Sequence, residues 1–202
     1  DTNYLEAYKS IDGLQEEGLN TYLLPMLKAW LLAGQNKNDA ALRIIDKKTS
    51  NAGLQTLYGI QGAMISEFGN NTKDAIVRYN RVAKLQKNVN LRVTILLGAL
   101  YERLGQNVNA KQIYDNYRDL HPGTTKLDRA YNRLKAAEKP EPNNQTVSDG
   151  VAEALFSLGF AIQNQDPYQA IIFSRLAIYL RPSFTIAKLL LAGSLEDNDK
   201  LK

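Results

Sequence analysis

The chain has 202 residues, of which 44% are hydrophobic and 23% are charged, a composition typical of a globular protein that buries a continuous core. Its net charge of +4 comes from 25 basic and 21 acidic residues, a mild excess without the clustered basic stripe of a nucleic-acid-binding protein. The absence of cysteine excludes disulfides and thiol chemistry, and no apolar run has the length that a membrane span needs.

Residues 1–19 are expected to contain one helix that has no preceding partner. Apolar side chains recur there at helical spacing, namely Tyr4, Leu5, Tyr8 and Ile11. This helix is interpreted as the second half of a helical pair whose first half is missing.

Three helical hairpins are expected over residues 20–54, 55–90 and 91–123, because the sequence repeats at a nearly constant spacing. The small residues that open the second helix of each hairpin are 35 residues apart, at Ala40, Ala75 and Ala110. Glycines in the turn between the two helices follow the same period, at Gly34, Gly69 and Gly105. Such a period indicates a helical repeat protein rather than an enzyme.

Glycine inside the first helix of a hairpin indicates a close helix contact. Gly98 follows Leu97 at a point where a side chain would push two helices beyond the distance of about 8–10 Å at which they interdigitate. Gly62 and Gly159 occupy the same register in other hairpins. Glycine there costs roughly 1 kcal/mol relative to alanine, so we expect these positions to lie where helices cross.

Residues 124–138 interrupt the period and are expected to form one extra helix, because they carry a single apolar stripe. The stripe consists of Leu127, Ala130, Tyr131, Leu134 and Ala137. Thr124 or Thr125 is the expected N-cap of this helix.

Residues 139–150 are expected to complete this insertion as a loop. They contain two prolines, no apolar period and the pair Asp149-Gly150. A loop of this length between helices is either functional or mobile, so a mobile spacer and a docking segment are both open interpretations.

Residues 151–183 return to the hairpin pattern, with Ala170 at the small position. Pro182 is expected to end the second helix of this hairpin, as Pro122 ends that of the third, because proline cannot continue a helix. Residues 184–202 then predict a trailing helix whose apolar face, Phe184 to Leu191, has no following helix to cover it. Both ends of the array look cut, which predicts an internal fragment of a longer protein.

No catalytic or metal site is expected from the residues present. His121, the single histidine, stands at the end of a second helix, where a structural role is expected. The acidic run Glu196–Asp199 is interpreted as a solvated terminus. The sequence contains no glycine-rich phosphate loop, no nucleophile elbow and no His-Glu-x-x-His pair, so we expect no enzyme activity, no metal and no cofactor.

The third hairpin resembles the tetratricopeptide repeat, a helix-turn-helix unit of about 34 residues, in the run Leu97-Gly98-(x2)-Tyr101-(x3)-Gly105-(x4)-Ala110-(x3)-Tyr114-(x7)-Pro122. Further blocks resemble larger tetratricopeptide-repeat proteins of alphaproteobacteria, namely Leu23–Gly34, Val151–Phe156 and Leu176–Pro182. The resemblance implies an all-α fold in which helix-turn-helix repeats stack in a right-handed superhelix, an α-solenoid. It also implies a bacterial protein, with the cytoplasm and the periplasm both open.

The resemblance further implies a concave groove, lined by first helices, that receives an extended peptide or a helix of a partner. The groove positions of the repeat correspond to Thr56, Gly59 and Ala63 in the second hairpin, to Arg92, Ile95, Ala99, Glu102 and Arg103 in the third, and to Glu153, Phe156, Phe160 and Gln163 in the fourth. The Lys and Asn set with which the chaperone-binding subtype clamps a terminal carboxylate is not found, so binding of a chaperone tail is not expected.

The leading hypothesis is therefore a noncatalytic protein-protein interaction scaffold or adaptor whose partner is a protein or peptide. One alternative is self-assembly into a homo-oligomer through the exposed terminal helices. Another is the regulatory repeat region of a larger protein. Neither nucleic acid nor a membrane span is expected.

Overall fold

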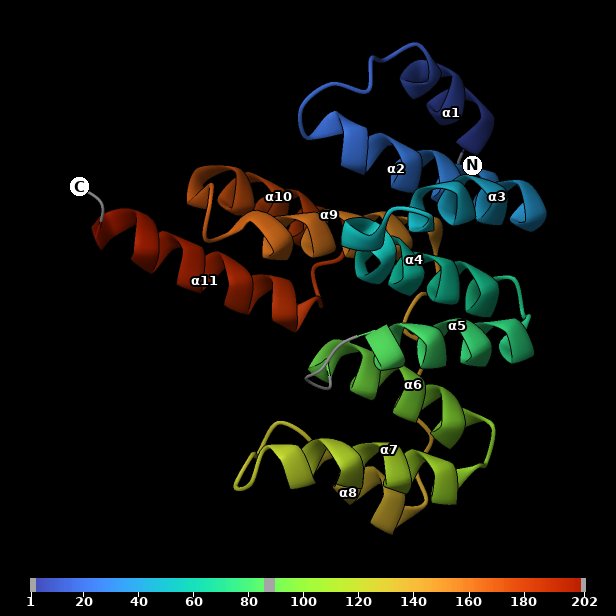
Figure 1. Cartoon of the computed structure of the whole chain (residues 1–202), viewed down its shortest axis with the longest axis vertical. Helices are drawn as coiled ribbons and strands as arrows, with labels where there is room; N and C mark the ends of the chain where they lie inside the picture. The colour runs from blue at the N-terminus through green and yellow to red at the C-terminus, as the bar shows by residue number, and fades with distance from the viewer. Residues whose placement is uncertain (1–2, 86–89, 201–202) are drawn as a thin grey trace. The chain divides into compact units, whose positions relative to one another are not determined.

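The computed structural model describes residues 3–85 and 90–200 (Figure 1), and within them the regular elements are 11 α-helices and one short 3-10 helix, with no strand. The expected all-α class is confirmed. Residues 86–89, at the end of the second expected hairpin, lie outside the described part. None of the helices in the described ranges has both the length and the apolar character to cross a membrane.

The chain divides into two compact units, each with its own packing. Unit 1 combines residues 1–48 with residues 146–202, and unit 2 consists of residues 49–145. Unit 2 is thus inserted into the sequence of unit 1, and unit 1 is completed only by the last part of the chain.

Unit 1 contains helices from both ends of the sequence. Their bounds are α1 Tyr4–Asp12, α2 Asn20–Gly34, α3 Asn38–Thr49, whose last residue falls in unit 2, α9 Val147–Ile162, α10 Pro167–Leu180 and α11 Thr185–Lys200. α1 packs on α2, α2 on α9, α9 on α10, and α10 on α11. The fourth expected hairpin, α9 with α10, therefore packs against α2, a helix far earlier in the sequence.

The contact between α2 and α9 depends on glycines in both helices. The indole of Trp30 lies so close to Gly150 that a Cβ on this glycine would be 2.2 Å from the ring. In the other direction, Val147 of α9 and Tyr4 of α1 lie against Gly34, and a Cβ there would be 2.6 Å from Val147. Because Gly150 has no side chain, the Trp30 ring packs directly against α9 and the two helices lie close together. Trp30 is 0% exposed.

Unit 2 stacks consecutive helices. After the 3-10 helix η1, Ala52–Leu54, its helices are α4 Gln55–Phe68, α5 Thr72–Leu85, α6 Leu91–Arg103, α7 Asn107–Leu120 and α8 Asp128–Ala136. Each helix from α4 to α7 packs on the next, and α8 packs on both α6 and α7. Gly98 lies under the ring of Tyr114, where a Cβ would be 2.2 Å from the ring, so the expected close contact at Gly98 is confirmed.

The turns within the first three hairpins have the same backbone geometry. Each turn has one residue in the left-handed region, at Asn36, Asn70 and Gly105, with φ values of 60, 60 and 72°. The amide of the next residue donates to the carbonyl five residues earlier, at 2.9, 2.8 and 2.9 Å. Of the three expected turn glycines, Gly105 is itself the left-handed residue, whereas Gly34 and Gly69 precede an asparagine that adopts this conformation.

The small residue of each second helix is fully buried. The positions with 0% exposure are Ala41, Ala75, Ala110 and Ala170. The expectation of Ala40 for the first hairpin is wrong, because the turn places the neighbouring Ala41 toward the core and leaves Ala40 partly exposed. The spacing is therefore 34 residues from Ala41 to Ala75 and 35 from Ala75 to Ala110.

The inserted region differs from expectation at both of its boundaries. The extra helix begins at Asp128 after Leu127, so neither Thr124 nor Thr125 caps it. The loop ends at Thr146, because the Thr146 side chain accepts from the Asp149 amide and the Asp149 carboxylate accepts from the Thr146 amide. This capping box starts α9 at Val147 and places Asp149 and Gly150 in the helix rather than in a loop.

The apolar face of the trailing helix is covered. Phe184, Ala187 and Leu190 are 4%, 0% and 6% exposed, and α11 packs on α10 and α9. The expectation of an uncovered face over Phe184–Leu191 is therefore wrong, because the preceding hairpin covers it. Leu189 points outward and is 67% exposed. The expected acidic run is described as far as Asp197, and both Glu196 and Asp197 are exposed.

Candidate peptide-binding face

Two of the expected groove residues, Arg92 and Arg103, lie at opposite ends of α6. The side chain of Asn90 caps the helix by accepting from the amides of Arg92 and Val93 at 2.8 and 3.3 Å, so Arg92 belongs to the first turn. Arg103 is the last residue of the helix. Both side chains are largely buried rather than extended into solvent.

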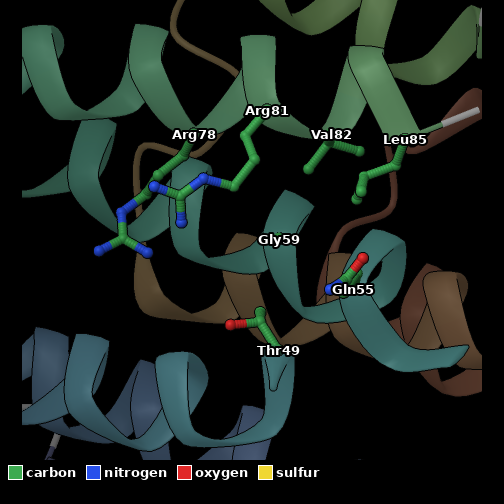
Figure 2. Close-up of a pocket in the computed structure, with 7 residues that line it drawn as sticks. All are labelled: Thr49, Gln55, Gly59, Arg78, Arg81, Val82 and Leu85. Carbon is green, nitrogen blue, oxygen red and sulfur yellow. The ribbon is translucent and has the colours of Figure 1, made fainter. Parts of the chain in front are cut away.

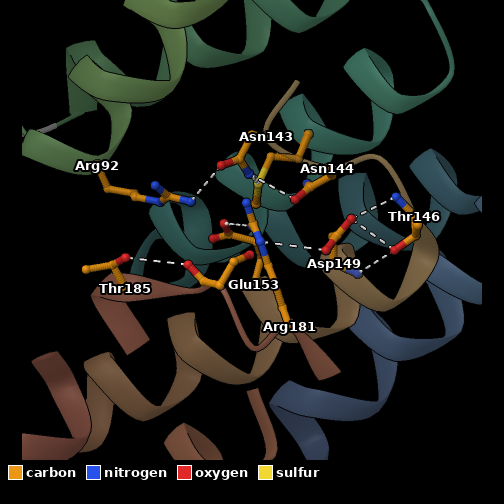
Figure 3. A network of polar contacts seen from close by, with 10 residues as sticks. Arg92, Asn143, Asn144, Thr146, Asp149, Glu153, Arg181 and Thr185 are labelled. Atoms are coloured by element: carbon orange, nitrogen blue, oxygen red, sulfur yellow. Dashed lines mark hydrogen bonds and ion pairs between the residues drawn. The ribbon is translucent and has the colours of Figure 1, made fainter. Parts of the chain in front are cut away.

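Residues 139–145, which we call the return segment, lie across these two arginines. The segment forms neither helix nor strand, and its prolines disfavour helical geometry at Lys139 and Glu141. Arg103 donates through Nη1 to the main-chain oxygen of Glu141 at 3.4 Å. Arg92 donates through Nη2 to Oδ1 of Asn143 at 3.1 Å, as Figure 3 shows. The structure therefore places this part of the loop in contact with both ends of α6.

Asn143 of the return segment contacts side chains of both α4 and α6. Besides accepting from Arg92, its amide nitrogen donates to Oδ1 of Asn144 at 2.9 Å and lies 3.6 Å from the sulfur of Met64 in α4. Asn144 is 9% exposed. The side-chain amide of Asn143 therefore contacts Met64 of α4 and Arg92 of α6 (Figure 3).

Arg103 is held in place by an ion pair with Glu67 of α4. Burial raises the pKa of Glu67, and the Arg103 charge with hydrogen bonds from Tyr79 and Arg103 offsets this effect only in part. Met64 and Glu67 on α4 and Arg92 and Arg103 on α6 together form what we call the α4–α6 face.

The remaining expected groove residues of unit 2 lie elsewhere. Glu102 is 1% exposed; it accepts from the Tyr114 hydroxyl at 2.6 Å and pairs with Arg133 of α8 at 2.8 Å. Burial and the hydrogen bond to Glu102 raise the pKa of Tyr114. Ile95 packs against the buried cluster between α7 and α8, and Thr56 is partly buried on α4. Glu102 and Ile95 therefore stabilise the hairpin internally.

The four expected groove residues of unit 1 divide into two buried and two more accessible side chains. Glu153 is 1% exposed and pairs with Arg181 at 3.2 Å (Figure 3). The ring of Phe156 lies 5.3 Å from that of Phe184 at the start of α11. Phe160 is 57% exposed, and Gln163 bonds back to the Phe160 carbonyl. Glu153 and Phe156 thus connect α9 to the residues that precede α11.

A separate pocket of about 120 Å³ lies between α4 and α5 (Figure 2). It is lined by Thr49, Gln55, Gly59, Arg78, Arg81, Val82 and Leu85. Arg78 pairs with Asp74 at 2.6 Å. Burial acts to raise the pKa of Asp74, but hydrogen bonds from Ser66 and Arg78 outweigh it and hold this pKa below its usual value.

Within the described residues, no group of three or more His, Asp or Glu side chains could hold a metal ion. His121 ends α7, and its ring lies 4.3 Å from that of Tyr117. Comparisons of the chain with models of known families, with characterised proteins and with solved structures found no match.

Several residues of the α4–α6 face and of the return segment were not found from the sequence. Glu141 and Asn143 stand in a stretch without apolar period, and only its two prolines indicate an extended chain. Met64 and Glu67 follow the pattern of a buried helix and carry no signal of their own. Their role follows from the path of the return segment, which local patterns do not specify.

Proposed function

We propose that this chain is a noncatalytic protein-interaction scaffold of the tetratricopeptide-repeat type, and that its α4–α6 face binds an extended peptide of a partner protein. One observation carries the proposal: the return segment, which is neither helix nor strand, already lies on this face and is held by Arg92 and Arg103.

The chemistry of the face suits an extended peptide. Arg103 bonds to a main-chain oxygen, so it holds any extended chain regardless of sequence, whereas Arg92 bonds to a side-chain amide and can select a residue type. Hydrogen bonds to charged groups contribute roughly 1.5–3 kcal/mol each. Arginine is also enriched among the residues that carry most of the energy of protein interfaces.

The tetratricopeptide-repeat assignment is supported by local geometry. The first three hairpins share one turn, and their buried alanines, Ala41, Ala75 and Ala110, are 34 and 35 residues apart. This spacing agrees with a repeat of about 34 residues.

Selection of linear peptides from a display library tests the proposal. The bait is the open variant, in which Gly and Ser replace residues 139–145 at unchanged length so that the face is uncovered. Selected peptides are then titrated calorimetrically against the open variant, its Arg92→Ala derivative and an Arg129→Ala control. Arg129 is an exposed arginine on α8 of the same unit, and Arg103 is left intact because its loss would strip Glu67 of its ion pair.

We expect the selected peptides to bind the open variant and its Arg129→Ala derivative equally. Arg92→Ala should weaken binding at least about tenfold, because one charge-assisted hydrogen bond is lost. Failure to select any peptide, or equal binding to all three proteins, would contradict the proposal.

A further inference from the structure

We infer that the return segment is an internal copy of the partner peptide: the face takes a non-helical segment in which a proline precedes an asparagine, and residues 139–145 must leave before such a peptide binds. The inference rests on the proposed function and names both the chemistry of its ligand and its regulation.

The preference for asparagine follows from the contacts of Asn143. Its carbonyl oxygen accepts from Arg92, while its amide nitrogen donates to Asn144 and contacts the Met64 sulfur. Only a side chain with both a donor and an acceptor can make these contacts at once. Alanine makes none of them, so replacement of this asparagine in a ligand should abolish most of its affinity.

The proline before Asn143 gives the segment its shape. Pro142 fixes its own φ and disfavours helical geometry at Glu141, whose main-chain oxygen accepts from Arg103. A peptide with this proline therefore loses less conformational freedom on binding than a flexible one.

The internal segment has a large advantage over the same peptide in solution. Tethered between α8 and α9, it acts at an effective concentration of roughly millimolar. A separate peptide of equal intrinsic affinity must exceed that concentration to displace it. Removal of the segment should therefore lower the apparent dissociation constant of a copy peptide by at least about tenfold.

The test titrates a synthetic peptide that copies residues 138–146 into the wild-type protein and into the open variant. Two altered peptides serve as a matched pair, one with alanine in place of Asn143 and one with alanine in place of the exposed Lys139. We expect at least about tenfold tighter binding to the open variant, loss of binding by the first altered peptide, and little change for the second.

A second readout follows the segment itself in the wild-type background. The chain has no cysteine, so a Gln145→Cys substitution gives one site for an environment-sensitive fluorophore. Saturating copy peptide should change its signal as the segment is displaced. Circular dichroism of the open variant establishes that its helices are intact.

The outcomes separate the two proposals. Equal binding of the copy peptide to both proteins, with an unchanged fluorophore signal, overturns the inference and leaves the peptide-binding function in place. Absence of binding to a folded open variant, when other library peptides bind it, also overturns the inference. Absence of binding by any linear peptide overturns the proposed function as well.

Discussion

Gly150 is the residue on which the contact between α2 and α9 depends. Trp30 covers it so closely that no side chain fits without moving the indole. Gly193, in the middle of α11, provides a control, because nothing lies within 4 Å of the position that its Cβ would occupy.

Gly150→Ala should destabilise unit 1, and Gly193→Ala should not. The added methyl group overpacks the contact with Trp30, which costs about 1–3 kcal/mol. At Gly193 the same change relieves the helix penalty of glycine and should stabilise α11 by up to about 1 kcal/mol. Urea unfolding followed by the fluorescence of Trp30, the single tryptophan, measures both effects. Equal stability of Gly150→Ala and wild type would show that the indole can move at no cost.

Single residues also show how far the sequence predicts the contacts. The contact of Gly98 with Tyr114 could be predicted, because both residues belong to one hairpin and their spacing sets their contact. The contact of Gly150 with Trp30 could not, because it joins distant parts of the chain and no periodicity connects them. The candidate site follows the same division: Arg92 and Arg103 come from the repeat pattern, while Asn143 depends on the path of the return segment.

At the scale of elements, α4 and α5 are tied together by Asp74. Its carboxylate accepts from the Ser66 hydroxyl and from Nε of Arg78, both at 2.6 Å. The Ser66 hydroxyl oxygen also lies 2.9 Å from the Gly62 carbonyl oxygen, and its bond to Asp74 links the last turn of α4 to the start of α5. The pKa of Asp74 is lowered in the folded state, because hydrogen bonds from Ser66 and Arg78 outweigh the effect of burial.

The lowered pKa of Asp74 sets the pH range in which it stabilises unit 2. Its contribution is fully present above the ordinary value of 3.8 and is lost as the pH falls through the lower pKa of the folded state. Asp74→Asn should therefore destabilise the protein by roughly 1 kcal/mol at neutral pH, since a third of the side chain is exposed. The difference in free energy of unfolding between Asp74→Asn and wild type should shrink as the pH falls through the lowered pKa of Asp74.

Urea unfolding at a series of pH values measures this dependence. Asp119→Asn, which changes an exposed carboxylate of α7, should leave the free energy of unfolding nearly unchanged at every pH. A constant difference between Asp74→Asn and wild type across the acid range would rule out the carboxylate as its source.

At the scale of the whole molecule, the two units differ in how far apart in sequence their packing partners lie. Unit 2 is built from consecutive helices, α4 to α8, whereas unit 1 joins α2 to α9. Repeat spacing predicts contacts between neighbours along the chain. It contains no information on whether a late helix packs against an early one, as α9 does on α2. The division of the chain into these two units therefore could not be predicted from the sequence.

Truncation after residue 145 should expose Trp30 and leave unit 2 folded. The cut removes α9 with Gly150, which covers the indole, but keeps all of residues 49–145. Tryptophan emission should shift to longer wavelength, while the helical signal of unit 2 persists in circular dichroism. A control truncated after residue 183 keeps α9 and α10 and should keep the buried emission. Unchanged emission after truncation at residue 145 would contradict the contact between Trp30 and Gly150.

The inserted position of unit 2 also matters while the protein is being made. A ribosome that adds 5–20 residues per second needs roughly ten seconds to pass from Trp30 to Gly150. During that time each helix of unit 2 emerges next to a helix that it packs on. The side of α2 that carries Trp30 has no helix to cover it until α9 emerges. That side of α2 is therefore the surface of the nascent chain that a chaperone at the ribosome would meet, and it disappears only after α9 has emerged.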